Sequence, residues 1–223
     1  MQDVTESDHD KVSAAISAAE TSSNGEIIAV TSETSDSYHD VGLHYAVLAL
    51  FLALAFFAAW PSQLEWWWTV LMGWTAPPTM RELLTLLLGI ALLKFLAVLM
   101  VMKWRPLRLA LTPGATKTRR VRRRAIMLFK TGAERRTIGR TGILIYLSLG
   151  EHRAEIVADE AITSVTTPET WGEAMAALLA EVKAGRPGDG IAAAVAIIGE
   201  VLTTHFPKSS EDQNEIPDKL IEL

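Results

Sequence analysis

The sequence contains no cysteine among its 223 residues. This excludes disulfide bonds, metal sites built on thiolates and catalysis by a cysteine nucleophile. The chain also has no P-loop, no H-E-x-x-H string and no G-x-S-x-G string. Its five histidines, at positions 9, 39, 44, 152 and 205, do not have the spacing of metal ligands. No motif therefore indicates catalysis, and the residues by themselves do not favour an enzyme.

Formal charge is nearly absent from two apolar stretches. Residues 41–64 carry none, and residues 83–102 carry only Lys94. A hydrocarbon core of roughly 30 Å needs about 20 helical residues, which both stretches provide. A soluble helix of this length would keep a polar face, and these do not. The sequence therefore predicts a transmembrane hairpin over residues 41–102, with spans of about 41–62 and 83–102.

The segment between the spans is rich in tryptophan and proline, as at a membrane surface, and residues 66–72 are too short to span and predict a shallow interfacial helix. Of the 21 Lys and Arg residues, 13 lie within residues 103–140, whereas this connection has only Arg81. By the positive-inside rule, both termini are expected in the cytoplasm. The acidic start has no apolar h-region, so a cleavable signal peptide is not expected.

Lys94 is a charge inside the second expected span, which is a functional hypothesis by default. The matching level of the first span, near Leu50 and Phe51, offers no carboxylate. The ammonium group either extends towards the cytoplasmic surface or meets a partner protein or a second copy, and we favour the first. Two helices with one lysine do not enclose a transport pathway by themselves.

Residues 1–40 predict a helix followed by a strand. Thr5 with Asp8, or Ser7 with Asp10, can form a capping box, and Gly25 can end the helix in a left-handed conformation. Residues 26–31 are apolar and β-branched, as in a buried strand. Because one strand cannot stand alone, it must pair with a strand beyond the hairpin.

Residues 141–207 supply the rest of the expected domain. Residues 142–149 and 153–159 predict two strands joined as a hairpin. One helix is expected to start at Thr167 and Pro168 and to end at Gly185, and another to be capped by Asp189 and to end before Pro207. Residues 208–223 are polar and predict a loop or flexible tail.

Residues 103–140 form a basic segment next to the membrane. Within it, residues 118–131 predict an amphipathic helix whose polar faces hold Arg119, Arg120, Arg122, Arg123 and Arg124. Each basic side chain near anionic lipid contributes about 1 kcal/mol of attraction, so anionic membrane lipid is the expected partner. The alternative, compatible with it, is that these charges only set the membrane topology. Nucleic acid is not expected, because the rest of the domain is acidic and no reader motif accompanies the arginines.

Three segments together resemble the TPM-domain family: NGEIIAVTSETSDSY, LFKTGAERRTIGRTGILIYLSLGEHRAEIVADEAI and GRPGDGIAAAVAIIGEVLTTHFP. The similarity is greatest to its bacterial membrane-protein branch, in which a helical hairpin interrupts the domain after the first strand. The resemblance implies an α/β domain with a mixed sheet flanked by helices, in the bacterial inner membrane. Relatives include thylakoid proteins with reported acid phosphatase activity and membrane proteins that modulate receptor assembly or gating.

Some relatives bind divalent cations, and Glu26, Asp159, Glu160 and Asp189 are the candidate ligands for calcium or magnesium here. Many relatives have a glycine-rich turn where this chain has Asp159-Glu160-Ala161, which puts that site in doubt. The plain alternatives are a solvated strand end and an ordinary helix cap. We expect a binding or assembly module with a membrane-protein partner; the alternative is a divalent-metal-dependent phosphatase at the membrane surface.

Overall fold

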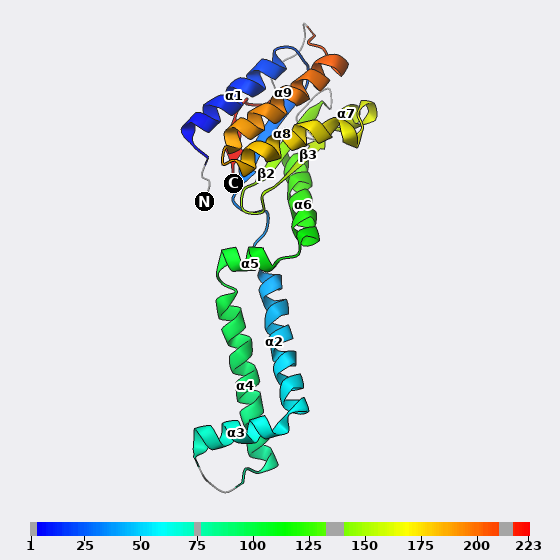
Figure 1. The fold of residues 1–223 in the computed structure, drawn as a ribbon. Coiled ribbons are helices and arrows are strands. Elements are labelled where there is room, and N and C mark those ends of the chain that lie inside the picture. The colour runs from blue at the N-terminus through cyan, green and yellow to red at the C-terminus, as the bar shows by residue number, and fades with distance from the viewer. Residues whose placement is uncertain (1–3, 74–76, 133–140, 210–215) are drawn as a thin grey trace. The chain divides into compact units, whose positions relative to one another are not determined.

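The computed structural model describes residues 4–73, 77–132, 141–209 and 216–223 (Figure 1). The chain forms two compact units. Residues 1–36 and 113–223 make the first unit, and residues 37–112, which interrupt it in sequence, make the second.

The first unit is built on a four-stranded mixed sheet in the order β3-β2-β1-β4. Strands β1 (Glu26–Ser32) and β2 (Gly142–Ser148) are parallel, with Glu26 opposite Gly142. Strand β3 (Arg153–Ala158) is antiparallel to β2. The predicted pairing of residues 26–31 with residues 142–149 is thus confirmed, as is a mixed α/β fold with helices flanking the sheet.

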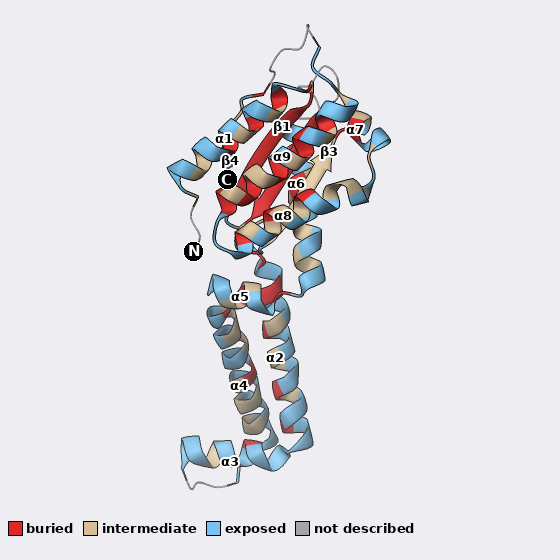
Figure 2. Cartoon of the chain, turned by 45° about the horizontal axis from the view of Figure 1, so that its top comes forward, coloured by how far each residue is buried: buried red, intermediate tan, exposed pale blue. Residues whose placement is uncertain are grey.

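Helices cover both faces of this sheet. Helices α1 (Glu6–Glu20), α8 (Gly172–Lys183) and α9 (Pro187–His205) pack on the face that carries Ile27 and Ala29. Helix α6 (Gly114–Gly132) packs on the opposite face, over Ile28 and Val30. Because both faces are covered, every residue of β1 and β2 is buried (Figure 2). This explains why both strands read as continuous apolar runs.

Two short helices connect β3 to α8, and the predicted cap of the first helix, α1, is present. Helix α7 (Glu160–Val165) and the 3-10 helix η1 (Pro168–Trp171) precede α8. Thr5 and Asp8 form the expected capping box of α1.

Gly25 differs from the prediction, because its φ is not positive. A Cβ there would lie 2.7 Å from the Leu202 side chain, so Gly25 lets α9 pack closely at this point and does not form a left-handed cap.

The end of the chain is not the polar tail that the sequence predicts over residues 208–223. Residues 210–215 lie outside the described residues, but Leu220–Glu222 form strand β4, parallel to Ala29–Thr31 of β1. Ile216 and Leu220 are buried in the two cores. A strand buried on both faces needs its edge covered, and this short apolar segment covers it.

The second unit is helical. It contains α2 (His39–Ala59), α3 (Pro61–Met72), α4 (Met80–Val101) and α5 (Arg105–Leu111), and α2 packs along α4. Helix α2 ends before the expected residue 62, because Trp60 leaves helical geometry and Pro61 starts α3. Helix α3 is therefore longer than the predicted residues 66–72. The basic segment of residues 103–140 divides into α5 and α6, and residues 133–140 lie outside the described residues.

Candidate functional site

The four carboxylates proposed as cation ligands do not converge. Asp189 lies in the first turn of α9, where it pairs with Lys11, and is not its N-cap, which is Arg186. Glu26 follows Gly25, which contacts Leu202 near the other end of α9. At 1.5 Å per residue, Asp189 and Leu202 are about 20 Å apart along the helix. Within the described residues, no group of three or more His, Asp or Glu side chains could hold a metal ion.

Asp159 was misplaced by sequence reasoning because of strand direction. Ligands of open α/β sheets bind beyond the carboxyl ends of parallel strands. Strand β3 is antiparallel to β2, so its carboxyl end lies at the other end of the sheet, where β1 and β2 begin. There Asp159 is buried and its Oδ2 accepts a hydrogen bond from the Gly142 N–H (3.2 Å), while Glu160 is exposed in α7. Asp159 therefore has a structural role, because its carboxylate accepts the N–H of Gly142, the first residue of β2.

The carboxyl ends of β1 and β2 carry a polar cluster that sequence reasoning missed. Ser35 N–H donates to Oε1 of the buried Glu151 (2.8 Å), and the Ser35 and Tyr146 hydroxyls lie 3.0 Å apart. Asp36 pairs with Arg120 of α6 at 3.0 Å. These bonds fix residues 33–36, the last of the first unit before the chain passes to residues 37–112. The cluster therefore fixes the start of this connection.

At the end of the sheet where β1 begins, Glu20, Glu26 and Asp218 form a second polar cluster. Glu20 is 7% exposed, and its Oε1 accepts the Ile27 N–H at 2.8 Å. Burial raises the pKa of Glu20 to about 8; the Ile27 hydrogen bond opposes the shift, and the charges of Glu26 and Asp218 add to it. The Glu20 carboxyl is therefore mostly neutral at pH 7.

The five arginines of α6 do not share one environment. Arg119, Arg122 and Arg123 are exposed, together with Met127 and Lys130. Arg120 turns inward to Asp36, with 16% of its side chain exposed, and Arg124 is partly buried. Burial raises the pKa of Glu155, which Arg122 opposes from 3.6 Å. The basic face of α6, defined as Arg119, Arg122, Arg123 and Lys130, is thus narrower than the sequence suggests.

Exposed apolar side chains distinguish α2 and α4. Three of the described helices are long and apolar enough to cross a membrane, namely α2, α4 and α9. Half of the apolar window of α9 is buried, against 28% for α2 and 6% for α4. Lys94 is also exposed on α4, so its side chain does not face α2.

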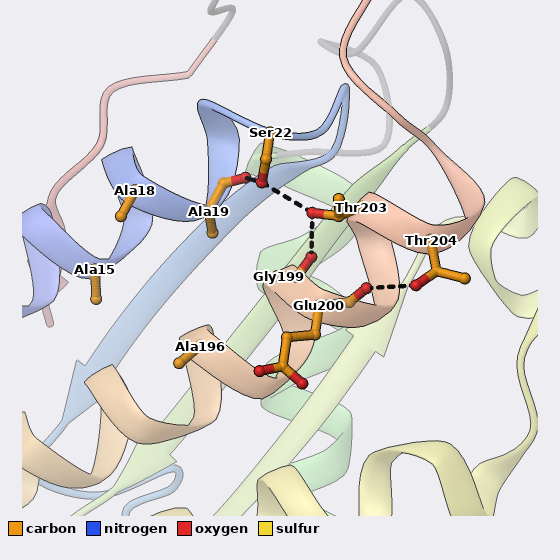
Figure 3. Close-up of a pocket in the computed structure, with 9 residues that line it drawn as sticks. All are labelled: Ala15, Ala18, Ala19, Ser22, Ala196, Gly199, Glu200, Thr203 and Thr204. Atoms are coloured by element: carbon orange, nitrogen blue, oxygen red, sulfur yellow. Dashed lines mark hydrogen bonds between the residues drawn. The ribbon is translucent and has the colours of Figure 1, made fainter.

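A hollow of about 530 Å³ lies between α1 and α9 (Figure 3). Small residues line it, with Glu200 as the charged member. Its hydroxyl groups are already bonded: Ser22 lies 2.8 Å from Thr203, which donates to the Gly199 carbonyl. Helices α1 and α9 pack closely where Gly199 and Ala19 line this hollow, since a Cβ at Gly199 would lie 2.8 Å from Ala19.

Comparisons with known proteins support the fold alone. No protein-family model matches the chain, and no curated protein matches it. Among solved structures, it is similar to the NMR structure of BA42 protein from the psychrophilic bacterium Bizionia argentinensis, with a TM-score of 0.57 and 16% sequence identity. The match covers 99% of this chain and 95% of that chain.

Proposed function

We propose that this chain is a TPM-type α/β domain held at the bacterial inner membrane by a transmembrane hairpin inserted after its first strand. In this proposal both termini are cytoplasmic, and the first unit acts as a binding or assembly module for a membrane-protein partner. The fold supports the TPM-type assignment in its general architecture. The observation that carries the proposal is the exposure of the apolar side chains of α2 and α4.

The exposure of these side chains supports the membrane assignment by its extent. In water, a soluble unit of two long helices would bury one apolar stripe and expose a polar one. Helix α4 instead exposes Leu84, Leu88, Leu93 and Met100, each by more than half. Burying such surface is worth about 25 cal/mol per Å², so hydrocarbon is the solvent that it fits.

The basic face of α6 supports contact with anionic lipid. Its exposed basic side chains lie on the outer side of the helix together with Met127, which is 48% exposed, and such a basic surface attracts anionic lipid. The partly buried edge of the helix is fixed to the sheet through Val121, Ala125 and Phe129.

A single-site fluorophore tests the lipid contact. Because the chain has no cysteine, Met127→Cys gives one attachment site on the full chain in nanodiscs. We expect the fluorophore emission to shift to the blue in anionic but not in neutral discs. Replacing Arg119 and Arg123 together by glutamine should weaken the contact of α6 with anionic lipid roughly thirtyfold, because each charge contributes about 1 kcal/mol. Lys183→Gln with Lys219→Gln is the control of equal charge. A blue shift independent of lipid charge would contradict the lipid contact.

The alternative of a divalent-metal-dependent phosphatase has less support, because Asp189 lies far from Glu26 and no group of three or more His, Asp or Glu side chains in the described part of the chain could hold a metal ion. Purified full chain should not hydrolyse a generic phosphomonoester in the presence of magnesium or calcium. Hydrolysis that is lost in Asp159→Ala would replace the binding role with the enzymatic one.

A further inference from the structure

Three carboxyl groups meet where α1 ends, β1 begins and the chain returns towards β4. Glu20 and Glu26 are 7% and 4% exposed. The Glu26 Oε2 accepts the Ile216 N–H at 3.2 Å. No donor among the described residues reaches Oε2 of Glu20, whereas the Asp218 carboxyl lies within hydrogen-bonding reach. Two carboxyl groups can share a hydrogen bond only if one carries a proton, and the deeper burial of Glu20 assigns the proton to Glu20, with Asp218 as the acceptor.

The groups around Glu20 favour the protonated form of its carboxyl group. Glu26 faces it from β1 and Asp218 from the segment before β4, and both are acidic. From α9, Gly199 and Thr203 reach this end of α1, and neither is charged. The chain brings Lys208 here through its backbone bond to Ser22, but the Lys208 side chain is exposed. Buried like charges disfavour ionisation, in agreement with the raised pKa of Glu20.

The segment that Asp218 belongs to is held weakly. Here residues 216–223 are called the C-terminal strap. Its strand β4 has three residues and, among the described residues, pairs with Ala29–Thr31. Ile216 and Leu220 are buried, Glu222 forms an exposed ion pair with His9 of α1, and the outer residues Ile221 and Leu223 are exposed. Such a short edge strand is marginal alone, so the contacts at Glu20 and Glu26 matter to its docking.

We propose that Glu20 is a proton-operated latch: its neutral carboxyl holds the C-terminal strap on the edge of β1, and loss of its proton to water releases the strap. On ionisation, Oε2 no longer donates to Asp218, and three negative charges face one another in a buried site. Movement of the strap separates Asp218 from the other two and admits water. The released state exposes the backbone edge of Ala29–Thr31. This inference concerns the first unit and does not depend on the proposed membrane role.

Hydrogen exchange on the full chain in nanodiscs tests the latch. Exchange of residues 216–223 is measured at pH 6.5 and pH 9 and corrected for the intrinsic effect of pH. We expect protection of the strap to fall at least tenfold at pH 9, while residues 142–148 of β2 stay protected. Equal corrected protection of the strap at both pH values would overturn the proposal.

Glu20→Gln is the decisive variant, because an amide can accept the Ile27 N–H and donate to Asp218 at every pH. Its strap should stay protected at pH 9, whereas Glu173→Gln, an exposed change on α8, should behave as the parent chain does. Loosening of Glu20→Gln as large as in the parent chain would overturn the latch.

Asp218→Asn gives a second test that does not alter the buried group. The amide that this substitution introduces can donate to an ionised Glu20, so this strap should also remain protected at pH 9. If it loosens as the parent chain does, repulsion at Asp218 is not what releases the strap.

Discussion

Leucine side chains in the two units differ in exposure. In the first unit, Leu144, Leu178 and Leu202 are at most 1% exposed. In the second unit, Leu88 and Leu93 of α4 are 68% and 69% exposed. The same residue type is thus turned inward in one unit and outward in the other. This difference is expected if the two units fold in different solvents, water for the first and lipid for the second.

The largest expected difference between the two units is their response to a charged substitution at an exposed apolar site. Leu88→Asp on α4 should disfavour membrane insertion by about 3 kcal/mol, because an aspartate near the centre of a span is costly. Val165→Asp, at a 46% exposed site of the first unit, should have little effect. The measurement is the fraction of each variant that stays in carbonate-washed membranes. Normal insertion of Leu88→Asp would mean that α4 does not face lipid.

Glycines in the two units should respond in opposite directions to alanine. In the first unit, a Cβ at Gly190 would lie 2.7 Å from the Leu178 carbonyl oxygen, so Gly190→Ala should lower the free energy of unfolding by about 1–3 kcal/mol. In α4, nothing lies within 4 Å of a Cβ at Gly89, so Gly89→Ala should be neutral or favour the helix by up to about 1 kcal/mol. Thermal unfolding in detergent compares the stability of the two variants. If Gly89→Ala lowers the stability, Gly89 must pack against another segment or a second copy of the chain.

The stability of the first unit should depend on pH through Glu20. The pKa of its carboxyl is about 8 in the folded chain and 4.5 without burial. The unfolded chain therefore releases this proton first, and stability is lost as the pH rises from about 4.5 to about 8. Chemical unfolding across this range should show the decline in the parent chain, and Glu20→Gln should show less of it. A decline of equal size in both would assign it to other groups.

The smallest expected effect separates two neighbouring arginines of α6. Arg120→Gln removes the ion pair with Asp36 and should cost about 0.5–1 kcal/mol of stability. Arg119→Gln, at an exposed site, should leave stability unchanged and weaken only the attraction to anionic lipid. Unfolding and the nanodisc assay together distinguish the two roles; equal losses of stability would show that Arg119 also has a structural partner.

The central pairing of the fold could be predicted because β1 is apolar and cannot stand alone. The amphipathic helix predicted over residues 118–131 is present within α6, but the sequence does not predict that its apolar face packs on the sheet. Strand β4 could not be foreseen, since its three residues follow a polar stretch and only the open edge of β1 gives them a partner.

The candidate sites were harder to predict than the fold. Ser35 and Glu151 are 116 residues apart, and no local pattern reports that they meet. Asp159 failed as a ligand although the predicted hairpin already implies that β3 runs antiparallel to β2: its carboxyl end lies where β1 and β2 begin, and there Asp159 accepts the Gly142 N–H. The raised pKa of Glu20 depends in part on Asp218, a residue brought beside it only by the returning chain.

Membrane topology tests the central claim most directly. The cysteine-free chain allows single cysteines at Ser7, Ser62 and Ser209, all exposed, to be labelled with a membrane-impermeant maleimide in spheroplasts. We expect Ser62→Cys to react at once, and Ser7→Cys and Ser209→Cys to react only after the membrane is opened. Labelling of Ser7→Cys and Ser209→Cys from opposite sides, or equal labelling of all three in intact spheroplasts, would contradict a hairpin that returns the chain to the cytoplasm.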